Sequence, residues 1–188
     1  TGPPCERCAE TVVTLQRTGD GTLPPVGVLG GMGPAATADF HRKLVAATPA
    51  RRDQEHVPLL IHSIPQIPDR AASILDGADS PAPALVSVAR SLQAAGAQLI
   101  VMPCNTAHFW YDELGQAVQI PVLHIVDPVL DVLSQQAALR RVGLLGTRAT
   151  VAAGLYARRA QQRTDRIREI EWVLPGPVQQ HEVVDAGI

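Results

Sequence analysis

The chain has 188 residues and a formal net charge of -2, with 46% hydrophobic, 18% charged and 3% aromatic residues. A chain of this length and composition can bury enough surface to fold without disulfides or a structural metal. It has neither a basic face for nucleic acid nor an apolar run near the roughly 18 residues that span a membrane, so we expect a cytoplasmic protein with no nucleic-acid or membrane partner.

The first 24 residues show no sustained hydrophobic period, and we interpret residues 1–24 as an N-terminal extension. Cys5 and Cys8 in this extension have the spacing of half a zinc site, but no second Cys/His pair lies near enough in the sequence to complete four ligands. Together with Cys104 they are an odd number without the spacing of a disulfide framework. We therefore expect reduced thiols and no metal site.

From Val26 onward, short apolar runs alternate with stretches of helical period, which is typical of a parallel sheet covered by helices. The expected strands are residues 26–29, 58–63, 98–102, 122–126, 142–145 and 171–174. The expected helices are residues 35–47, 82–95, 106–117, 128–138 and 151–162, with a last one that begins near Pro177. This alternation predicts a doubly wound α/β fold.

An internal repeat divides the chain. Residues 27–30 and 143–146 each end a strand with a glycine turn, and Ala-Thr follows at Thr37 and at Thr150, each time before a helix. Ligands of open parallel sheets bind beyond the carboxyl ends of the strands, so two such units that face each other would place both turns at one cleft. We predict two similar doubly wound domains related by a pseudo-twofold axis, at residues 25–125 and 126–188, with the second incomplete.

Residues 102–108, Met-Pro-Cys-Asn-Thr-Ala-His, combine the features of a reactive site. Pro103 ends the preceding strand, and Asn105 or Thr106 is a natural N-cap for the helix that follows. Cys104 is then expected at the carboxyl end of a strand and beside a helix N-terminus, which favours a thiolate and can bind a carboxylate. The alternative is a buried, inert cysteine. His108 is expected on the same helical side, as a proton carrier or, more commonly for such a histidine, as a packing residue.

The glycine turn after the first expected strand is a second candidate site. Gly31, Gly33 and Ala36 satisfy the pattern G-x-G-x-x-A of dinucleotide-binding proteins. However, Pro34 occupies the turn, and the second expected strand does not end in the acidic residue that binds a ribose. A turn around Met32 and Gly33 fits better as one that lets backbone N–H groups and the Thr37 hydroxyl approach a small carboxylate.

A stiff loop at residues 65–70, with two prolines, is the third candidate site, because Arg70 could bind a substrate carboxylate through its bidentate guanidinium. Cofactor chemistry is not expected. Lys43, the only lysine, lies on the polar face of an expected helix and is a poor candidate for a pyridoxal phosphate imine. No G-K-[ST] sequence follows a glycine-rich loop, which excludes a nucleotide phosphate loop.

Four segments in this order resemble the aspartate/glutamate racemase superfamily, and specifically its aspartate racemase branch. They are residues 30–37, 51–56, 65–70 and 102–108, and the similarity extends from Val26 to about Gln162. The glutamate racemase branch has an acidic residue and a serine in place of Gly-Gly-Met at residues 30–32. The resemblance implies two pseudo-symmetric α/β domains with the active site between them, usually in a homodimer, and neither cofactor nor metal.

The resemblance also implies a mechanism and a set of site residues. In this family one cysteine thiolate removes the α-proton while a second cysteine delivers a proton to the opposite face. Cys104 matches the first of the two cysteines. Arg70 matches the residue for the distal carboxylate of an acidic amino acid, with aspartate as the first expectation. The other positions expected to bind substrate are Met32, Gly33, Thr37, Asn105, Thr106 and Thr150.

The family's second cysteine, in a Cys-Thr-Glu motif, has no counterpart in this chain. An interval of 67 residues separates Thr37 from Cys104, and the same interval from Thr150 leads to about position 217, beyond Ile188. We therefore expect a fragment of a longer racemase. Two alternatives are a one-cysteine member that protonates a carbanion on a single face, as the decarboxylases of the superfamily do, and a non-catalytic carboxylate-binding module.

Overall fold

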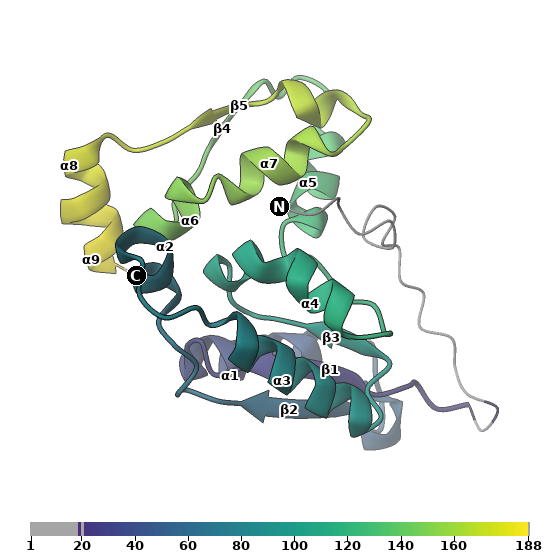
Figure 1. The fold of residues 1–188 in the computed structure, drawn as a ribbon. Coiled ribbons are helices and arrows are strands. Elements are labelled where there is room, and N and C mark those ends of the chain that lie inside the picture. The colour runs from purple at the N-terminus through teal and green to yellow at the C-terminus, as the bar shows by residue number, and fades with distance from the viewer. Residues whose placement is uncertain (1–18, 20, 188) are drawn as a thin grey trace.

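Five short parallel strands organise the part of the chain that the structure, a computed structural model, describes, namely residues 19 and 21–187. The first sheet has the order β2-β1-β3 and the second consists of β4 and β5 (Figure 1). The strands are β1 (Val26–Gly30), β2 (Leu59–Ser63), β3 (Leu99–Val101), β4 (Arg141–Gly143) and β5 (Glu171–Val173). This is a mixed α/β fold with parallel sheets, as the sequence predicts.

Helices connect the strands and cover the sheets. The α-helices are α1 (Pro34–Ala47), α2 (Arg70–Asp76), α3 (Ala82–Ala94), α4 (Tyr111–Ala117), α5 (Asp127–Ser134), α6 (Arg148–Ala152), α7 (Leu155–Gln161), α8 (Pro177–Gln179) and α9 (Asp185–Gly187). The 3₁₀ helices are η2 (Asp53–Glu55), η3 (Thr106–Trp110) and η4 (Arg166–Glu169), and the π-helical turn η5 (Gln180–Val184) joins α8 to α9. Among the residues described, no helix is long and apolar enough to cross a membrane.

The first sheet is built around β1, which pairs in parallel register with β2 on one side and β3 on the other. Every residue of β1 is buried, as expected for a central parallel strand covered on both faces. Gly27 allows α3 to pack closely, because a Cβ atom at this position would lie 3.2 Å from the Cβ of Leu92. Because β1 and β3 run parallel, their carboxyl ends lie at the same edge of the sheet.

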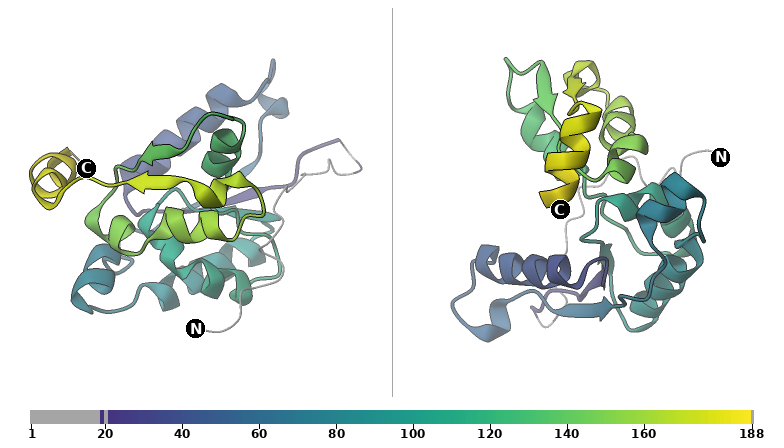
Figure 2. Two further views of the ribbon diagram at one scale, coloured as in Figure 1. Left: turned by 90° about the horizontal axis from the view of Figure 1, so that it is seen from above. Right: turned by 90° about the vertical axis from the view of Figure 1, so that its left-hand side faces the viewer.

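Two clusters of buried side chains form the core. The first packs on the β2-β1-β3 sheet, and its largest fully buried members are Leu29, Leu85, Ile100 and Leu114. The second packs beside β4 and β5 and consists of Val126, Leu130, Leu155, Ala160, Ile167 and Ile170. The right-hand view of Figure 2 shows the elements of these two clusters as two bodies, and α2 and η3 of the first body contact α6 and α7 of the second.

Five of the six predicted strands are confirmed, and the remaining one, at residues 122–126, is wrong. Only an isolated bridge between Val122 and Ile100 forms there. Beyond the bridge, two backbone N–H groups bond to histidine side chains and not to a neighbouring strand. Ile125 N–H donates to His108 Nε2, and Val126 N–H donates to His124 Nδ1. The apolar pattern of this segment predicted its burial correctly but not its hydrogen-bond partners.

The predicted helices at residues 35–47 and 82–95 correspond to α1 and α3, and a helix begins at Pro177 as expected. The expected helix at 106–117 is the 3₁₀ helix η3 followed by α4, and the one at 128–138 is α5, which ends at Ser134. The expected helix at 151–162 is α6 and α7, which Gly154 separates with a left-handed φ of 59°. Sequence analysis missed α2, and Arg70 begins this helix instead of ending a loop.

Candidate active site

The turn between β1 and α1 depends on two glycines. A Cβ atom on Gly30 would lie 2.6 Å from the Thr37 side chain, and Gly31 has a φ of +96° with Ile64 backbone atoms only 2.3 Å from the position of its absent Cβ. The Thr37 hydroxyl accepts from Gly31 N–H (3.0 Å) and donates to the carbonyl of Gly33 (3.3 Å). Thr37 is buried and thus holds the turn in shape, while Gly33 and the next three residues are exposed.

The start of α1 lacks a side-chain cap. Gly33 is the N-cap residue and has no side chain that could accept a hydrogen bond, and Pro34 follows as the first helical residue. The first backbone N–H groups of a helix have no partner within the helix, and they attract an anion. Met32 is buried beneath this turn. The turn therefore leaves the backbone at the start of α1 exposed, and the binding of a carboxylate there stays a prediction.

Cys104 lies in the short loop after β3. Its backbone N–H donates to the carbonyl of Met102 (2.8 Å), and its side chain is half-buried, between a buried Met102 and an exposed Asn105. Asn105 is at the N-cap position of η3, but its side chain does not cap that helix. Its Oδ1 accepts instead from the hydroxyl of Tyr156 in α7, at 2.8 Å. The Cys104 loop is thus hydrogen-bonded to α7, which packs in the second cluster.

A group of three threonine hydroxyls joins this loop to the turn after β4. Thr106 Oγ1 lies 2.9 Å from Thr150 Oγ1 and 3.2 Å from Thr147 Oγ1, and the last two hydroxyls are 3.1 Å apart. Thr147 also caps α6, because its Oγ1 accepts from Thr150 N–H (3.2 Å). Thr106 and Thr150 are 9% and 2% exposed, so their hydrogen bonds have little competition from water. The structure thus brings the second copy of the internal repeat to the residue two positions after Cys104.

His108 is buried and hydrogen-bonds to the backbone of the Cys104 loop. Its Nδ1 lies 2.7 Å from the carbonyl oxygen of Cys104, and its Nε2 accepts from Ile125 N–H at 3.1 Å. A carbonyl requires a donor at Nδ1 and an N–H requires an acceptor at Nε2, so the ring is the neutral Nδ1–H tautomer. Burial lowers the pKa of His108 to about 4, which keeps it neutral near pH 7. These contacts favour the packing role over the proton carrier that sequence analysis also considered.

A second buried histidine lies beside the first. The rings of His124 and His108 are 4.9 Å apart, and the ring of Tyr111 is 4.6 Å from that of His124. Burial, followed by the positive charges of protonated His108 and Arg159, lowers the pKa of His124 to about 2. The Tyr111 hydroxyl donates to the carbonyl of Val122 at 2.8 Å. These buried rings form a cluster that carries no charge near pH 7 and packs next to the Cys104 loop.

Arg70 begins α2, whose N-cap Asp69 accepts from Ala72 N–H at 2.8 Å. Its Nη1 donates to the loop carbonyls of Ile67 (3.2 Å) and Pro68 (3.1 Å), so the guanidinium is folded onto the loop that carries it. The helix α2 packs against both α6 and η3. Arg70 therefore lies on an element that borders the threonine hydroxyls, although its own hydrogen bonds stay within the loop.

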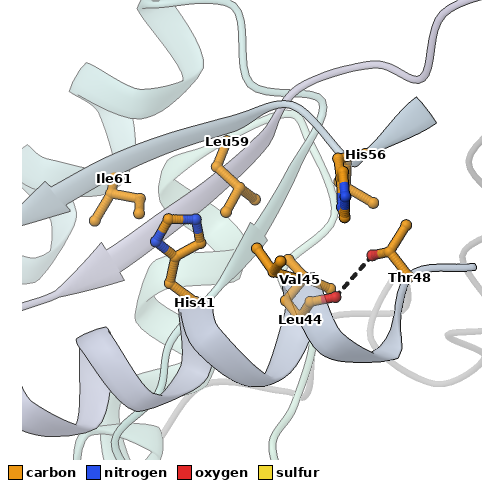
Figure 3. A pocket seen from close by; sticks show the side chains of 8 residues that line it. His41, Leu44, Val45, Thr48, His56, Leu59 and Ile61 are labelled. Atoms are coloured by element: carbon orange, nitrogen blue, oxygen red, sulfur yellow. Dashed lines mark hydrogen bonds between the residues drawn. The ribbon is translucent and has the colours of Figure 1, made fainter. Parts of the chain in front are cut away.

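The described residues also form a cavity away from these side chains. An apolar cavity of about 300 Å³ lies between α1 and the edge strand β2 (Figure 3). Its lining residues are His41, Leu44, Val45, Thr48, His56, Val57, Leu59 and Ile61, and none of them is a predicted site residue. Within the described ranges, no group of three His, Cys, Asp or Glu side chains could bind a metal. Cys5 and Cys8 lie outside the described residues.

Sequence reasoning missed two residues of the site. Thr147 gave a detectable signal, since Thr-x-x-Thr after a strand and a glycine is a pattern for a helix N-cap. Tyr156 gave no such signal, because its contact with Asn105 crosses 51 positions of sequence. Only the packing of α7 against η3 brings these two side chains together.

Comparison with known proteins gives the family of this chain. Residues 29–186 match the family described as Asp/Glu/hydantoin racemase. The chain belongs to this family. It is 33% identical over 135 residues to the broad specificity amino-acid racemase RacX of Bacillus subtilis, an alignment that covers 70% of this chain and 58% of RacX. Over 73 residues it is 34% identical to a glutamate racemase of Corynebacterium kroppenstedtii, with coverage of 38% and 25%.

The fold of this racemase family member is also that of a solved relative. An aspartate racemase of Picrophilus torridus superimposes with a TM-score of 0.71 at 36% identity. The superposition covers 81% of this chain and 62% of the aspartate racemase. The chain thus spans about three fifths of the length of RacX and of the Picrophilus protein.

Proposed function

We propose that this chain carries the proton-transfer site of an amino-acid racemase that needs no cofactor, with Cys104 as the acid–base group and an acidic amino acid as substrate. The main support is the contact between Thr106 and Thr150, which brings the turn after β4 to the Cys104 loop. Polar groups from two βα turns then lie beside the loop that carries the Cys104 thiol, at the carboxyl ends of parallel strands, where ligands of such sheets bind. Membership of the racemase family supports the same reaction class.

In the proposed reaction, the Cys104 thiolate accepts the α-proton of the substrate. An S–H bond forms as the C–H bond breaks, and the electron pair delocalises from the α-carbon into the α-carboxylate. The thiol then returns a proton to the carbanion. The α-proton is far less acidic than a thiol, so hydrogen-bond donors must stabilise the carbanion. Asn105, Thr106 and Thr150 are the donors that we assign to this task.

We assign the rest of the substrate to the first βα turn and to α2. The exposed backbone around Gly33, beside Met32 and the turn-forming Thr37, suits a carboxylate. Arg70 would bind the distal carboxylate, once its guanidinium exchanges the loop carbonyls for the stronger, charge-assisted partner. Aspartate is the substrate we favour, and the name of the Picrophilus relative supports it. We also propose a homodimer, which light scattering coupled to gel filtration would test.

The decisive experiment follows deuterium incorporation from D₂O into L- and D-aspartate by proton NMR, with chiral chromatography on the same samples. We expect exchange in one enantiomer without inversion, because Cys104 is the one cysteine among the described residues and reaches one face of the α-carbon. Cys104→Ser should abolish the exchange, with an unchanged circular dichroism spectrum. Cys8→Ser serves as the matched thiol control and should keep full exchange.

Two outcomes contradict the proposal. Full exchange in Cys104→Ser would remove the assigned acid–base group. An absence of exchange in the unmodified chain, with aspartate still bound, would leave a carboxylate-binding module in place of an enzyme. Inversion by the unmodified chain would instead show that a second acid acts on the opposite face, and would extend the proposal to complete racemisation.

A further inference from the structure

We infer that Tyr156 is a positioning residue of this site, which holds the amide of Asn105 so that its N–H groups face the α-carboxylate of the substrate. The inference rests on the proposed function, since it assigns the source of a substrate contact within the same site. Tyr156 lies in α7, so the contact makes substrate binding next to Cys104 depend on an element of the second cluster.

The hydrogen bond determines the orientation of the amide. The Tyr156 hydroxyl lies 2.8 Å from Asn105 Oδ1 and donates to it. An amide has its oxygen and its two N–H donors on opposite sides of the same carbon, so a partner fixed at Oδ1 also fixes where Nδ2 points. Without this partner the amide can rotate by 180° and present its oxygen, which repels a carboxylate.

The tyrosine is itself well anchored. Its ring packs against the second core cluster and lies 5.7 Å from the ring of Trp172 in β5. Burial raises the pKa of Tyr156 above its ordinary value of 10, so the hydroxyl keeps its proton near pH 7 and acts as a donor. A rigid donor of this kind imposes its geometry on the more exposed Asn105.

The surroundings of Asn105 indicate a role in binding more than in folding. The next three residues, Thr106, Ala107 and His108, are buried, whereas Asn105 is exposed. A hydrogen bond at an exposed side chain adds little to stability, because water replaces either partner. The side chain also leaves the N-cap of η3 unfilled, although asparagine is among the preferred capping residues. Its amide is therefore held for another use beside the reactive cysteine.

The test compares Tyr156→Phe with the unmodified chain in the aspartate exchange reaction. Loss of one oriented donor should raise KM about three- to tenfold, with a smaller change in kcat. The thermal midpoint and the rate at which iodoacetamide alkylates Cys104, measured on its peptide by mass spectrometry, should stay unchanged. Thr48→Val is the control: it removes a hydroxyl that donates to the carbonyl of Leu44 in α1, outside the candidate site, so it should leave KM unchanged.

A double-mutant cycle with Asn105→Ala completes the test. If Tyr156 acts through Asn105, then Tyr156→Phe has no further effect on KM in the Asn105→Ala background. Additive effects, or an unchanged KM in Tyr156→Phe while the unmodified chain exchanges normally, would overturn the role of Tyr156 and leave the proposed function intact. If the unmodified chain neither binds nor exchanges aspartate, the proposed function fails, and the role of Tyr156 fails with it.

Discussion

Individual side chains at the candidate site differ in whether they are exposed or hold the backbone through hydrogen bonds. Thr37 and His108 each use both a donor and an acceptor within the protein. Cys104 and Asn105 are more exposed, and they lie on the loop that these contacts shape. The residue types were evident from the sequence, but this division between supporting and exposed groups depends on contacts that the sequence does not contain.

The hydrogen bonds of His108 lead to a prediction with two isosteric variants. His108→Asn keeps a donor near the position of Nδ1, and His108→Gln keeps an acceptor near that of Nε2. Each leaves one buried group unpaired and should lower stability by about 1–3 kcal/mol. Only the asparagine variant still bonds the Cys104 carbonyl, so it should keep more of the exchange rate. Urea unfolding and deuterium exchange measure the two effects, and a glutamine variant that is the more active would contradict the assignment.

Arg70 gives a prediction about substrate choice. Arg70→Lys should weaken exchange of aspartate more than exchange of alanine or serine, because an ammonium group cannot form the bidentate contact with a distal carboxylate. Steady-state exchange of the three amino acids provides the comparison, and Arg51→Lys, at an exposed position, is the control. Equal losses for all three substrates would mean that Arg70 supports the loop and does not select the substrate.

At the level of elements, the turn between β1 and α1 depends on glycine at particular positions. Gly31→Ala should lower the free energy of unfolding by about 3 kcal/mol or more, since it combines a left-handed backbone with a severe overlap. Gly33→Ala is a matched control, because its φ is -96° and a Cβ atom there meets nothing within 4 Å. Urea midpoints for both variants test the prediction. Similar losses would show that the turn adjusts to a side chain at Gly31.

The segment at residues 122–126 shows where reasoning from elements failed. Its five apolar or aromatic residues have the pattern of a buried strand, and the segment is indeed largely buried. Leu123 N–H still donates to the carbonyl of Ile100 in β3. The N–H groups of Ile125 and Val126, however, bond to imidazole nitrogens, so the pairing with β3 is limited to the bridge at Val122. An apolar sequence pattern predicts that a segment is buried. Whether the segment joins a sheet depends on which groups its backbone N–H donors bond to.

For the whole molecule, the two buried histidines predict how stability depends on pH. Burial holds the pKa of His108 at about 4 and that of His124 at about 2, below the ordinary 6.5. As the pH falls below 6.5, these histidines become protonated in the unfolded chain but stay neutral in the folded chain. The free energy of unfolding therefore declines until the folded histidines titrate. The slope should approach about 1.4 kcal/mol per pH unit for each histidine.

Urea unfolding between pH 7.5 and 4.5 measures this decline. His124→Asn, which keeps an acceptor for Val126 N–H, should reduce the slope by about one proton's contribution. His41→Gln is the control, because His41 is exposed and its removal should leave the slope unchanged. A slope that is the same in all three proteins would show that His124 does not govern the acid sensitivity.

The α/β class, five of the six strands, and the segments around Cys104 and the glycine turn were predictable from the amino-acid sequence, because hydrophobic period and turn chemistry are local properties. The contacts of Thr106 with Thr150 and of Asn105 with Tyr156 were decided only by the tertiary structure. They join residues 44 and 51 positions apart, and such pairs form only when two packed bodies meet. The internal repeat predicts that the turns after β1 and β4 share a cleft, and this stays a prediction. Packing, in contrast, decided that the turn after β4 meets the loop after β3.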